Sequence, residues 1–191
     1  MSRAERYTAA HWIALGHKDL AEGGADAVKL EAICKAAGLT RGSFYHHFKD
    51  HPAFLAALAA AWADRNTSRL MAGLGTNDGQ PDADARTLNE RAFDLDFALE
   101  VGMRDLARRH PAVAEIVAET DDWRLAVLRD LAQARFGLSS DKAADVAFLE
   151  YAAFCGMMLI RPGLDRATRD RLSRLLDDMT LRQAAQVWRP D

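Results

Sequence analysis

The chain has 191 residues, of which 49% are hydrophobic and 28% are charged. This composition is typical of a globular protein and excludes a disordered chain, because disorder goes with low hydrophobicity and high net charge. The length excludes a large multidomain protein, and the formal net charge of −3 argues against a protein that coats nucleic acid along its whole length.

Hydrophobic spacing and turn residues predict an all-α fold, since no segment alternates hydrophobic and polar residues as a half-buried strand does. The first part of the chain is expected to hold four helices, at about 3–22, 30–37, 41–48 and 50–71. Gly23 and Gly38 suit helix C-termini, because glycine tolerates the left-handed conformation. After a glycine-rich loop at 73–81, four longer helices are expected, at about 85–109, 111–136, 140–160 and 166–187.

The two short helices have the layout of a helix-turn-helix, whose second helix can enter a DNA major groove. Phe44 and Phe48 share one face of that second helix and can hold it against the others, whereas Gly42, Tyr45 and His46 lie on the opposite side. Arg41 and Ser43 at its start and Lys49 after its end supply hydrogen-bond donors for phosphates and base edges. In the alternative interpretation, Tyr45 is a half-buried core residue and the histidines beside it are simply solvated. That interpretation gives no common reason for the residue types found together from Gly38 to Lys49.

Residues 30–50, LEAICKAAGLTRGSFYHHFKD, resemble the DNA-binding segment of the tetracycline-repressor (TetR) family of bacterial transcription regulators. The resemblance extends back to about Trp12 and forward into the fourth helix, so it covers roughly the first third of the chain. It implies an N-terminal three-helix helix-turn-helix DNA-binding domain at 1–50 and a C-terminal helical ligand-binding and dimerisation domain at 51–191. The second part resembles the family in architecture alone.

The resemblance also implies roles for individual residues. Phosphates would be contacted by Thr40, Tyr45, His46 and Lys49. Base edges would be faced by Arg41, Gly42 and Ser43, with Arg41 suited to a bidentate contact with guanine. The family usually has a serine or threonine at the start of the second helix, where this chain has Val28 and Lys29. Either Lys29 replaces that phosphate contact, or the contact is lost.

The helix at 140–160 predicts a homodimer, because it is apolar nearly all round from Val146 to Ile160 and must be covered on every side. We expect it to form a four-helix bundle with the last helix and their symmetry mates. The expected interface residues are Ala152, Ala153, Gly156, Leu172, Leu175, Leu176 and Met179. Such a dimer would present two recognition helices, roughly 34–36 Å apart, to a pseudo-palindromic operator in double-stranded DNA.

A small-molecule effector of unknown identity is expected in the second part, since similar proteins bind their inducers there. The candidate lining residues are Phe93, Phe97, Glu100, Arg104, Trp123 and Val127. The other interpretation is that these aromatic residues are ordinary core. A protein partner in place of the small ligand is the alternative mode of regulation, and a closed core without a cavity would favour it. A cavity beside Trp123 would favour a ligand-responsive repressor, in which the fourth helix transmits the change.

Several classes are not expected. The chain has no glycine-rich phosphate loop, no serine nucleophile elbow and no His-Glu-x-x-His, so we expect no catalytic residues and no enzyme. Cys34 and Cys155 are far apart without a histidine cluster, which predicts no metal site, and nothing calls for a cofactor. The apolar stretch 146–160 is interrupted by Glu150 and is short for a membrane span. With a charged N-terminus, this predicts a cytoplasmic protein that binds no membrane.

Overall fold

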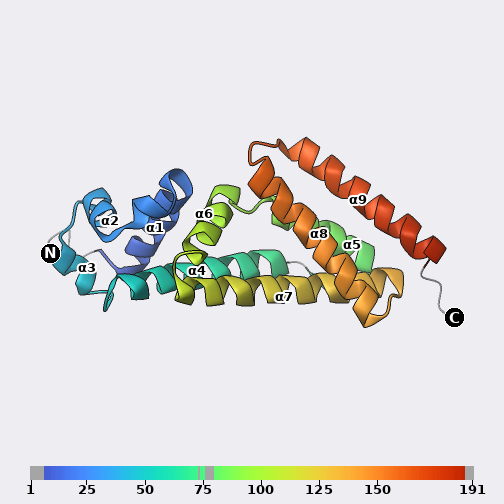
Figure 1. The fold of residues 1–191 in the computed structure, drawn as a ribbon, viewed down its shortest axis with the longest axis horizontal. Coiled ribbons are helices and arrows are strands. Elements are labelled where there is room, and N and C mark those ends of the chain that lie inside the picture. The colour runs from blue at the N-terminus through green and yellow to red at the C-terminus, as the bar shows by residue number, and fades with distance from the viewer. Residues whose placement is uncertain (1–6, 73, 76–79, 188–191) are drawn as a thin grey trace. The chain divides into compact units, whose positions relative to one another are not determined.

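The computed structural model describes residues 7–72, 74–75 and 80–187, the last four of them by backbone alone. Every regular element in this part of the chain is a helix, which confirms the all-α prediction (Figure 1). The elements are α1 (Ala9–Gly23), η1 (Ala25–Val28, a 3₁₀ turn), α2 (Leu30–Ala37), α3 (Arg41–Tyr45), α4 (His51–Met71), α5 (Pro81–Phe93), α6 (Phe97–Ala107), α7 (Pro111–Phe136), α8 (Ser140–Ile160) and α9 (Arg166–Val187).

The described residues divide into two compact units. Unit 1 comprises residues up to 67 together with 96–120, and unit 2 comprises 68–95 together with residues from 121 onward. Helices α4 and α7 therefore each contribute residues to both units. Unit 1 contains more of the chain than the DNA-binding domain expected at 1–50, because α6 and the first part of α7 join its core. The functional boundary at residue 50 stays a prediction.

The prediction of one helix at 85–109 is wrong, because the chain turns between α5 and α6. Asp94 ends α5, and the Asp96 side chain accepts a hydrogen bond of 3.1 Å from the amide of Leu99, which caps a new helix. α5 also begins earlier than expected, with Pro81 in its first turn.

Two ends near the N-terminus also differ from prediction. Thr8 has extended backbone and caps α1, so that helix starts at Ala9 instead of residue 3. The recognition helix α3 ends at Tyr45 instead of residue 48, and the chain continues through a turn in which the amide of His47 donates to the carbonyl of Phe44 at 3.0 Å.

Unit 1 is built around three aromatic rings that meet edge to face. The Phe44 ring lies 5.3 Å from the ring of Trp12 and 5.3 Å from that of Phe54, and all three side chains are fully buried. Such contacts add specificity to the burial of large apolar surfaces. Helix α6 approaches α1 closely at Gly102, where a Cβ would lie 3.0 Å from the carbonyl oxygen of Leu20. No larger residue fits there without displacing backbone.

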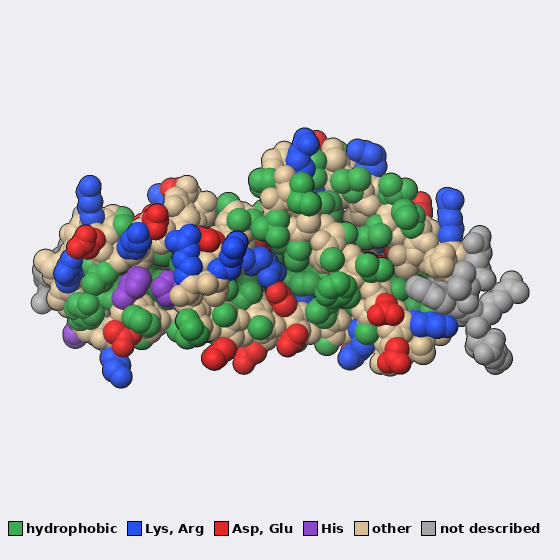
Figure 2. Space-filling model, in the orientation of Figure 1, with side chains coloured by type: hydrophobic (Ala, Val, Ile, Leu, Met, Phe, Trp, Pro, Cys, Tyr) green, Lys and Arg blue, Asp and Glu red, His purple; other side chains and the backbone are tan. Residues whose placement is uncertain are grey.

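In unit 2, α8 buries one face and leaves another exposed. Ala143, Val146, Ala147 and Met158 are buried, while Phe148, Leu149, Leu159 and Ile160 are exposed. Leu175 and Met179 of α9 are exposed as well. Hydrophobic side chains gather over these two helices in Figure 2. We call these six exposed residues of α8 and α9 the apolar face.

The expectation that no helix is long enough to span a membrane needs correction. α8 has 21 residues and is apolar enough, by length and composition, to cross a bilayer. The apolar stretch considered for a membrane span began at Val146, whereas the helix, predicted and found at 140–160, also contains the apolar Ala143 and Ala144. Only 22% of its apolar window is buried, so the rest of this window is exposed or half-buried within one copy of the chain.

Candidate functional site

The helix-turn-helix prediction is confirmed, and local interactions set the position of α3. Gly38 ends α2 with φ of 65°, a left-handed conformation that glycine adopts without a Cβ clash. Thr40 then caps α3, its hydroxyl accepting from the amide of Ser43 at 3.3 Å. Phe44 and Phe48 are buried in the unit 1 core. One side of α3 is thereby fixed, and the other side faces outward.

The outward side of α3 carries the residues expected to contact DNA. Tyr45 is 48% exposed, with the edge of its ring packed against Phe44 at 5.5 Å between centroids. Ser43 is half-buried. The other expected contacts are exposed, namely Lys29, Thr40, Arg41, Gly42, His46 and Lys49. The eight positions thus lie on α3 and the segments that flank α2 and α3.

Gly42 has room for a side chain. A Cβ built there would have its nearest neighbour, the Thr40 hydroxyl, at 3.6 Å, which is an ordinary van der Waals distance. The fold of unit 1 therefore does not require glycine at this position. The side chain that glycine lacks would project only from the outer surface. Its absence therefore lets a binding partner come close to the backbone of α3.

Two ion pairs engage the cations of this surface, and neither was predicted. The Arg41 guanidinium pairs with the carboxylate of Glu31 on α2. The Lys29 ammonium lies 2.9 Å from the carboxylate of Asp26 and lowers the pKa of that group. All four side chains are more than half exposed. Exposed pairs of this kind contribute little to stability, so Arg41 and Lys29 can exchange partners at small cost.

The start of α4 is tied to the helix-turn-helix by a contact that the sequence did not reveal. The His51 imidazole Nε2 lies 2.8 Å from the carbonyl oxygen of Val28, just before α2. Asp50 caps α4 by accepting from the amide of Ala53 at 2.8 Å. Lys49, which precedes this cap, is thus placed by two anchored neighbours.

Unit 2 contains a cavity of about 770 Å³ beside Trp123. Its walls come from α5, α7, α8 and α9, with Leu70 from the end of α4. Five aromatic residues line it, namely Phe93, Trp123, Phe136, Tyr151 and Phe154. Of the expected effector-binding residues, the structure brings together Phe93, Trp123 and Val127. Phe97, Glu100 and Arg104 belong to unit 1 and do not line this cavity.

A buried arginine in the cavity wall, Arg135, is the centre of a network of charges. Its guanidinium, in a side chain only 8% exposed, lies 2.9 Å from the carboxylate of Asp82 and 2.7 Å from that of Asp177. Burial raises the pKa of Glu150 to about 7, with Arg135 opposing the rise and Asp177 adding to it. On the α7 side, Arg124 donates to the Tyr151 hydroxyl at 3.1 Å. Sequence reasoning missed these charged residues because they come from helices far apart in the chain.

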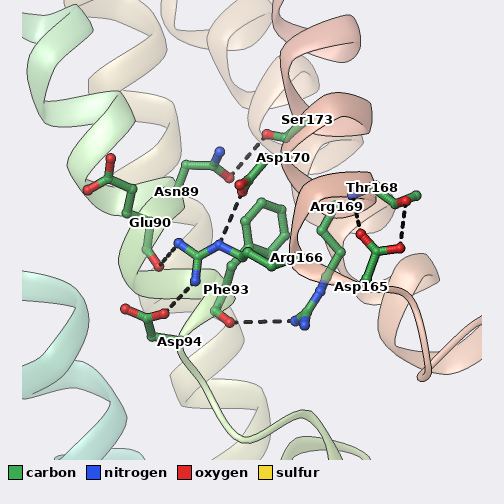
Figure 3. A network of polar contacts seen from close by, with 10 residues as sticks. All are labelled: Asn89, Glu90, Phe93, Asp94, Asp165, Arg166, Thr168, Arg169, Asp170 and Ser173. Atoms are coloured by element: carbon green, nitrogen blue, oxygen red, sulfur yellow. Dashed lines mark hydrogen bonds and ion pairs between the residues drawn. The ribbon is translucent and has the colours of Figure 1, made fainter.

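Polar and aromatic contacts join α5 to α9 at residues that line the cavity, among them Asn89, Phe93 and Ser173 (Figure 3). The guanidinium carbons of Arg166 and Arg169 each lie 5.8 Å from the centroid of the Phe93 ring. Arg166 also pairs with Asp94. The Ser173 hydroxyl donates to the side-chain oxygen of Asn89 at 3.1 Å. We call these six residues the α5–α9 clamp.

The residues expected at a dimer interface fall into two groups. Ala153, Leu172 and Leu176 line the cavity. Ala152, Leu175 and Met179 are exposed, and Gly156 is half-buried with no atom closer than 4.0 Å to an added Cβ. The exposed residues of α8 at 148, 149, 159 and 160 were not predicted, although they belong to the same apolar run.

Comparisons with known proteins were made for the sequence and for the fold. Residues 13–58 match the family model described as bacterial regulatory proteins of the tetR family. A search of curated protein sequences gave no match. Among solved structures, a protein from Pseudomonas aeruginosa PAO1 described as a transcriptional regulator has a TM-score of 0.78 at 17% identity, covering 99% of this chain and 96% of that one.

Two further structures are similar. A transcriptional regulator from Rhodococcus sp. Rha1 has a TM-score of 0.72 at 21% identity, covering 92% of each chain. A protein from Saccharomonospora viridis, described as a transcriptional regulator and solved in complex with choline, has a TM-score of 0.75 at 14% identity, covering 89% of this chain and 93% of that one. At these identities the likeness extends to the fold of both parts of the chain.

Proposed function

We propose that the protein is a homodimeric, ligand-responsive repressor, on the premise that residues 13–58 match the model of the tetR family of bacterial regulatory proteins. The similar structures are transcriptional regulators and not enzymes. In this proposal each subunit places α3 in the major groove of one half of a pseudo-palindromic operator. A small molecule in the unit 2 cavity releases the DNA.

The observation that carries the proposal is the two-sided character of α3. Phe44 locks one side into the unit 1 core, while Tyr45, His46 and Gly42 face outward. We assign phosphate contacts to Thr40, Tyr45, His46 and Lys49, and base-edge contacts to Arg41, Gly42 and Ser43. The hydroxyl, imidazole and amine groups suit phosphate oxygens, and the guanidinium suits the two acceptors of guanine.

Lys29 takes the phosphate contact that the family usually makes with a serine or threonine. Its ammonium is exposed and pairs with the exposed Asp26. A DNA phosphate offers a stronger partner than Asp26 because the duplex concentrates negative charge along its backbone. We therefore include Lys29 in the DNA-contacting surface of residues 1–50.

The apolar face of α8 and α9 is the proposed dimer interface. Exposed Phe148, Leu149, Leu159 and Ile160 form, with Leu175 and Met179, a surface of the kind that marks an interaction site. An isologous dimer covers it with its own copy, so no second partner is needed. This also accounts for the apolar composition of α8 without a membrane, in keeping with a cytoplasmic location.

The cavity favours a small ligand over a protein partner as the effector. It lies beside Trp123, is lined by aromatic residues and has a volume suited to a small molecule. One protein of similar fold was solved in complex with choline. We propose that α4, which begins beside Lys49 and ends with Leu70 in the cavity wall, transmits ligand binding to the DNA-contacting surface. The effect is limited by the difference in ligand affinity between the two conformations.

The test is selection of bound fragments from the genome of the source organism, followed by anisotropy titrations at two salt concentrations. Wild type is compared with Tyr45→Ala and with Lys142→Ala, a control at the exposed start of α8. We expect one or a few palindromic sites, affinity that falls with salt, loss of binding in Tyr45→Ala, and no change in the control. Equal binding of all fragments by the wild type and Tyr45→Ala would overturn the proposal.

A further inference from the structure

Glu150 places a carboxyl group in the wall of the unit 2 cavity. It lies on α8 within unit 2. Among the described residues, none donates a hydrogen bond to it or forms an ion pair with it. Glu150 is half-buried, and a carboxylate that loses part of its hydration without gaining a hydrogen bond is unfavourable.

The two buried arginines of the cavity wall, Arg135 and Arg124, already have partners. Arg135 attracts the Glu150 carboxylate, but its guanidinium is bound to Asp82 and Asp177. Arg124 donates to the Tyr151 hydroxyl. The remaining charged groups of the wall are the exposed Arg86 of α5 and the exposed Arg174 and Asp178 of α9. The inner wall therefore holds no surplus of positive charge that would call for an anionic ligand.

Aromatic rings flank Glu150 on its own helix and across the cavity. Tyr151 and Phe154 are stacked, with centroids 6.3 Å apart and an interplanar angle of 17°. Trp123 lines the cavity from α7. Aromatic faces attract cations through their quadrupole and also give an apolar body a surface to pack on. The Phe93 ring already has two guanidinium groups against it in the α5–α9 clamp (Figure 3).

We infer that the cavity takes a small organic cation with an apolar body, its charged nitrogen against the Glu150 carboxyl and its body against Trp123, Tyr151 and Phe154. This inference rests on the proposed function, in which the same cavity holds the effector. The cation supplies the partner that Glu150 lacks. An anion of the same size would instead meet Glu150 and the carboxylates around Arg135.

Proton linkage gives the inference a second signature. Burial raises the pKa of Glu150 to about 7 when the cavity holds no ligand. A bound cation stabilises the ionised carboxylate and so displaces a proton at neutral pH. The affinity for a cation therefore rises with pH, by about tenfold between pH 6 and pH 8, and levels off above that. A neutral ligand has no such dependence on Glu150.

The experiment compares three probes that share one body and differ in charge. These are 4-phenylbutylamine, 4-phenylbutan-1-ol and 4-phenylbutyrate, titrated into the full-length protein by isothermal calorimetry. The amine is expected to bind at least about tenfold more tightly than the alcohol, which corresponds to about 1.4 kcal/mol, and the carboxylate most weakly. Its affinity should rise between pH 6 and pH 8, with proton release seen in buffers of different ionisation enthalpy.

The variant Glu150→Gln keeps the shape of the side chain and removes its charge. We expect it to lose both the preference for the amine and the pH dependence, while Asp178→Asn, at the exposed rim of the same cavity, keeps both. Binding of the alcohol or the carboxylate as tight as that of the amine would overturn the inference. So would an amine affinity that is unchanged in Glu150→Gln, or the absence of binding by all three probes.

Operator binding by the same preparation separates the two proposals. If the DNA selection yields a specific site but the amine does not bind, the inference about the cavity fails and the proposed function as a regulator stands. If the amine binds with the expected pH dependence but no DNA site emerges, the inference holds and the proposed function fails. Release of the operator by the amine in wild type, but not in Glu150→Gln, supports both.

Discussion

The indole nitrogen of Trp62 on α4 donates a hydrogen bond of 2.9 Å to the Glu100 carboxylate on α6. Asn66, one turn further along α4, donates to the same oxygen at 2.6 Å. Glu100 is fully buried, so these bonds offset part of the cost of removing a carboxylate from water. Glu100 was expected to bind an effector, and here it joins α4 to α6 within unit 1.

Replacing Glu100 tests this structural role. Glu100→Leu leaves two buried donors without their acceptor and should lower the free energy of unfolding by about 2–4 kcal/mol, measured by urea denaturation. Glu100→Gln keeps an acceptor oxygen and should cost clearly less. Equal stability of Glu100→Leu and wild type would contradict the assignment.

Arg41 and Lys49 should affect DNA binding in different ways. Arg41→Ala removes a base contact and should cost about 1–3 kcal/mol on the preferred operator, with relaxed preference at one base pair. Lys49→Ala removes a phosphate contact, weakens binding to all sequences alike and lowers the salt slope by about 1. Anisotropy titrations on a set of operator variants distinguish the two. Identical profiles for both variants would refute the assigned roles.

Glu31 should act as a competitor for Arg41. The pair is exposed, so Glu31→Gln should change stability by less than about 1 kcal/mol. Operator affinity should rise about two- to fivefold. The reason is that the substitution removes a carboxylate that would repel the phosphates of the DNA backbone. Glu22→Gln, at the exposed end of α1, is the control. Weaker binding by Glu31→Gln would instead mean that Glu31 holds Arg41 in its DNA-bound position.

The apolar face should be needed for dimerisation. Leu175→Glu and Leu149→Glu each place a charge where two copies would exclude water, and both should shift the protein to monomers in sedimentation velocity. Operator affinity should fall with them, since one half-site contact alone is weak. Ala118→Glu, on an exposed part of α7, should leave the dimer intact. A dimer that survives both leucine substitutions would place the interface elsewhere.

Glu150 should make wild-type stability depend on pH. Its pKa in the folded protein is about 7, above the ordinary value of 4.5. The folded state therefore binds more protons between these values, and its stability falls as the pH rises from about 4.5 to 7. Glu150→Gln has no carboxyl group to ionise, so its stability does not fall in this way. Its free energy of unfolding relative to wild type should therefore increase with pH by at most about 3 kcal/mol. Parallel pH profiles of thermal unfolding for the two proteins would contradict this.

The helix-turn-helix was predictable because its determinants are local. The glycine that ends α2, the threonine that caps α3 and the two phenylalanines that fix α3 lie within 11 residues of one another. By contrast, the sequence gives no sign that Arg41 pairs with Glu31. Side chains on two different helices meet only once the helices have packed.

The break between α5 and α6 was hidden by an unbroken apolar pattern. Leu88, Leu95, Leu99 and Leu106 keep helical spacing through the turn at Asp94 and Asp96. A continuous helix would have carried Phe93 and Phe97, four residues apart, on one face. Because the chain turns, Phe93 lines the unit 2 cavity, whereas Phe97 and Glu100 join unit 1.

The charged wall of the cavity was out of reach of sequence reasoning. Arg135 is 53 residues from Asp82 and 42 residues from Asp177. Nothing in the local pattern around Glu150 distinguishes it from a polar interruption of an apolar helix. Only the packing of α5, α7, α8 and α9 brings these groups to one place.

Helix α9 has one side in the cavity and another in solvent. Leu172 and Leu176 line the cavity, while Leu175 and Met179 belong to the apolar face. In a dimer built on that face, effector occupancy and subunit association share a single free-energy cycle. Dilution of the protein then lowers the fraction of dimer, as does an effector that weakens the association of the subunits. The number of copies in the cell would therefore set the dose of effector at which the regulated genes respond.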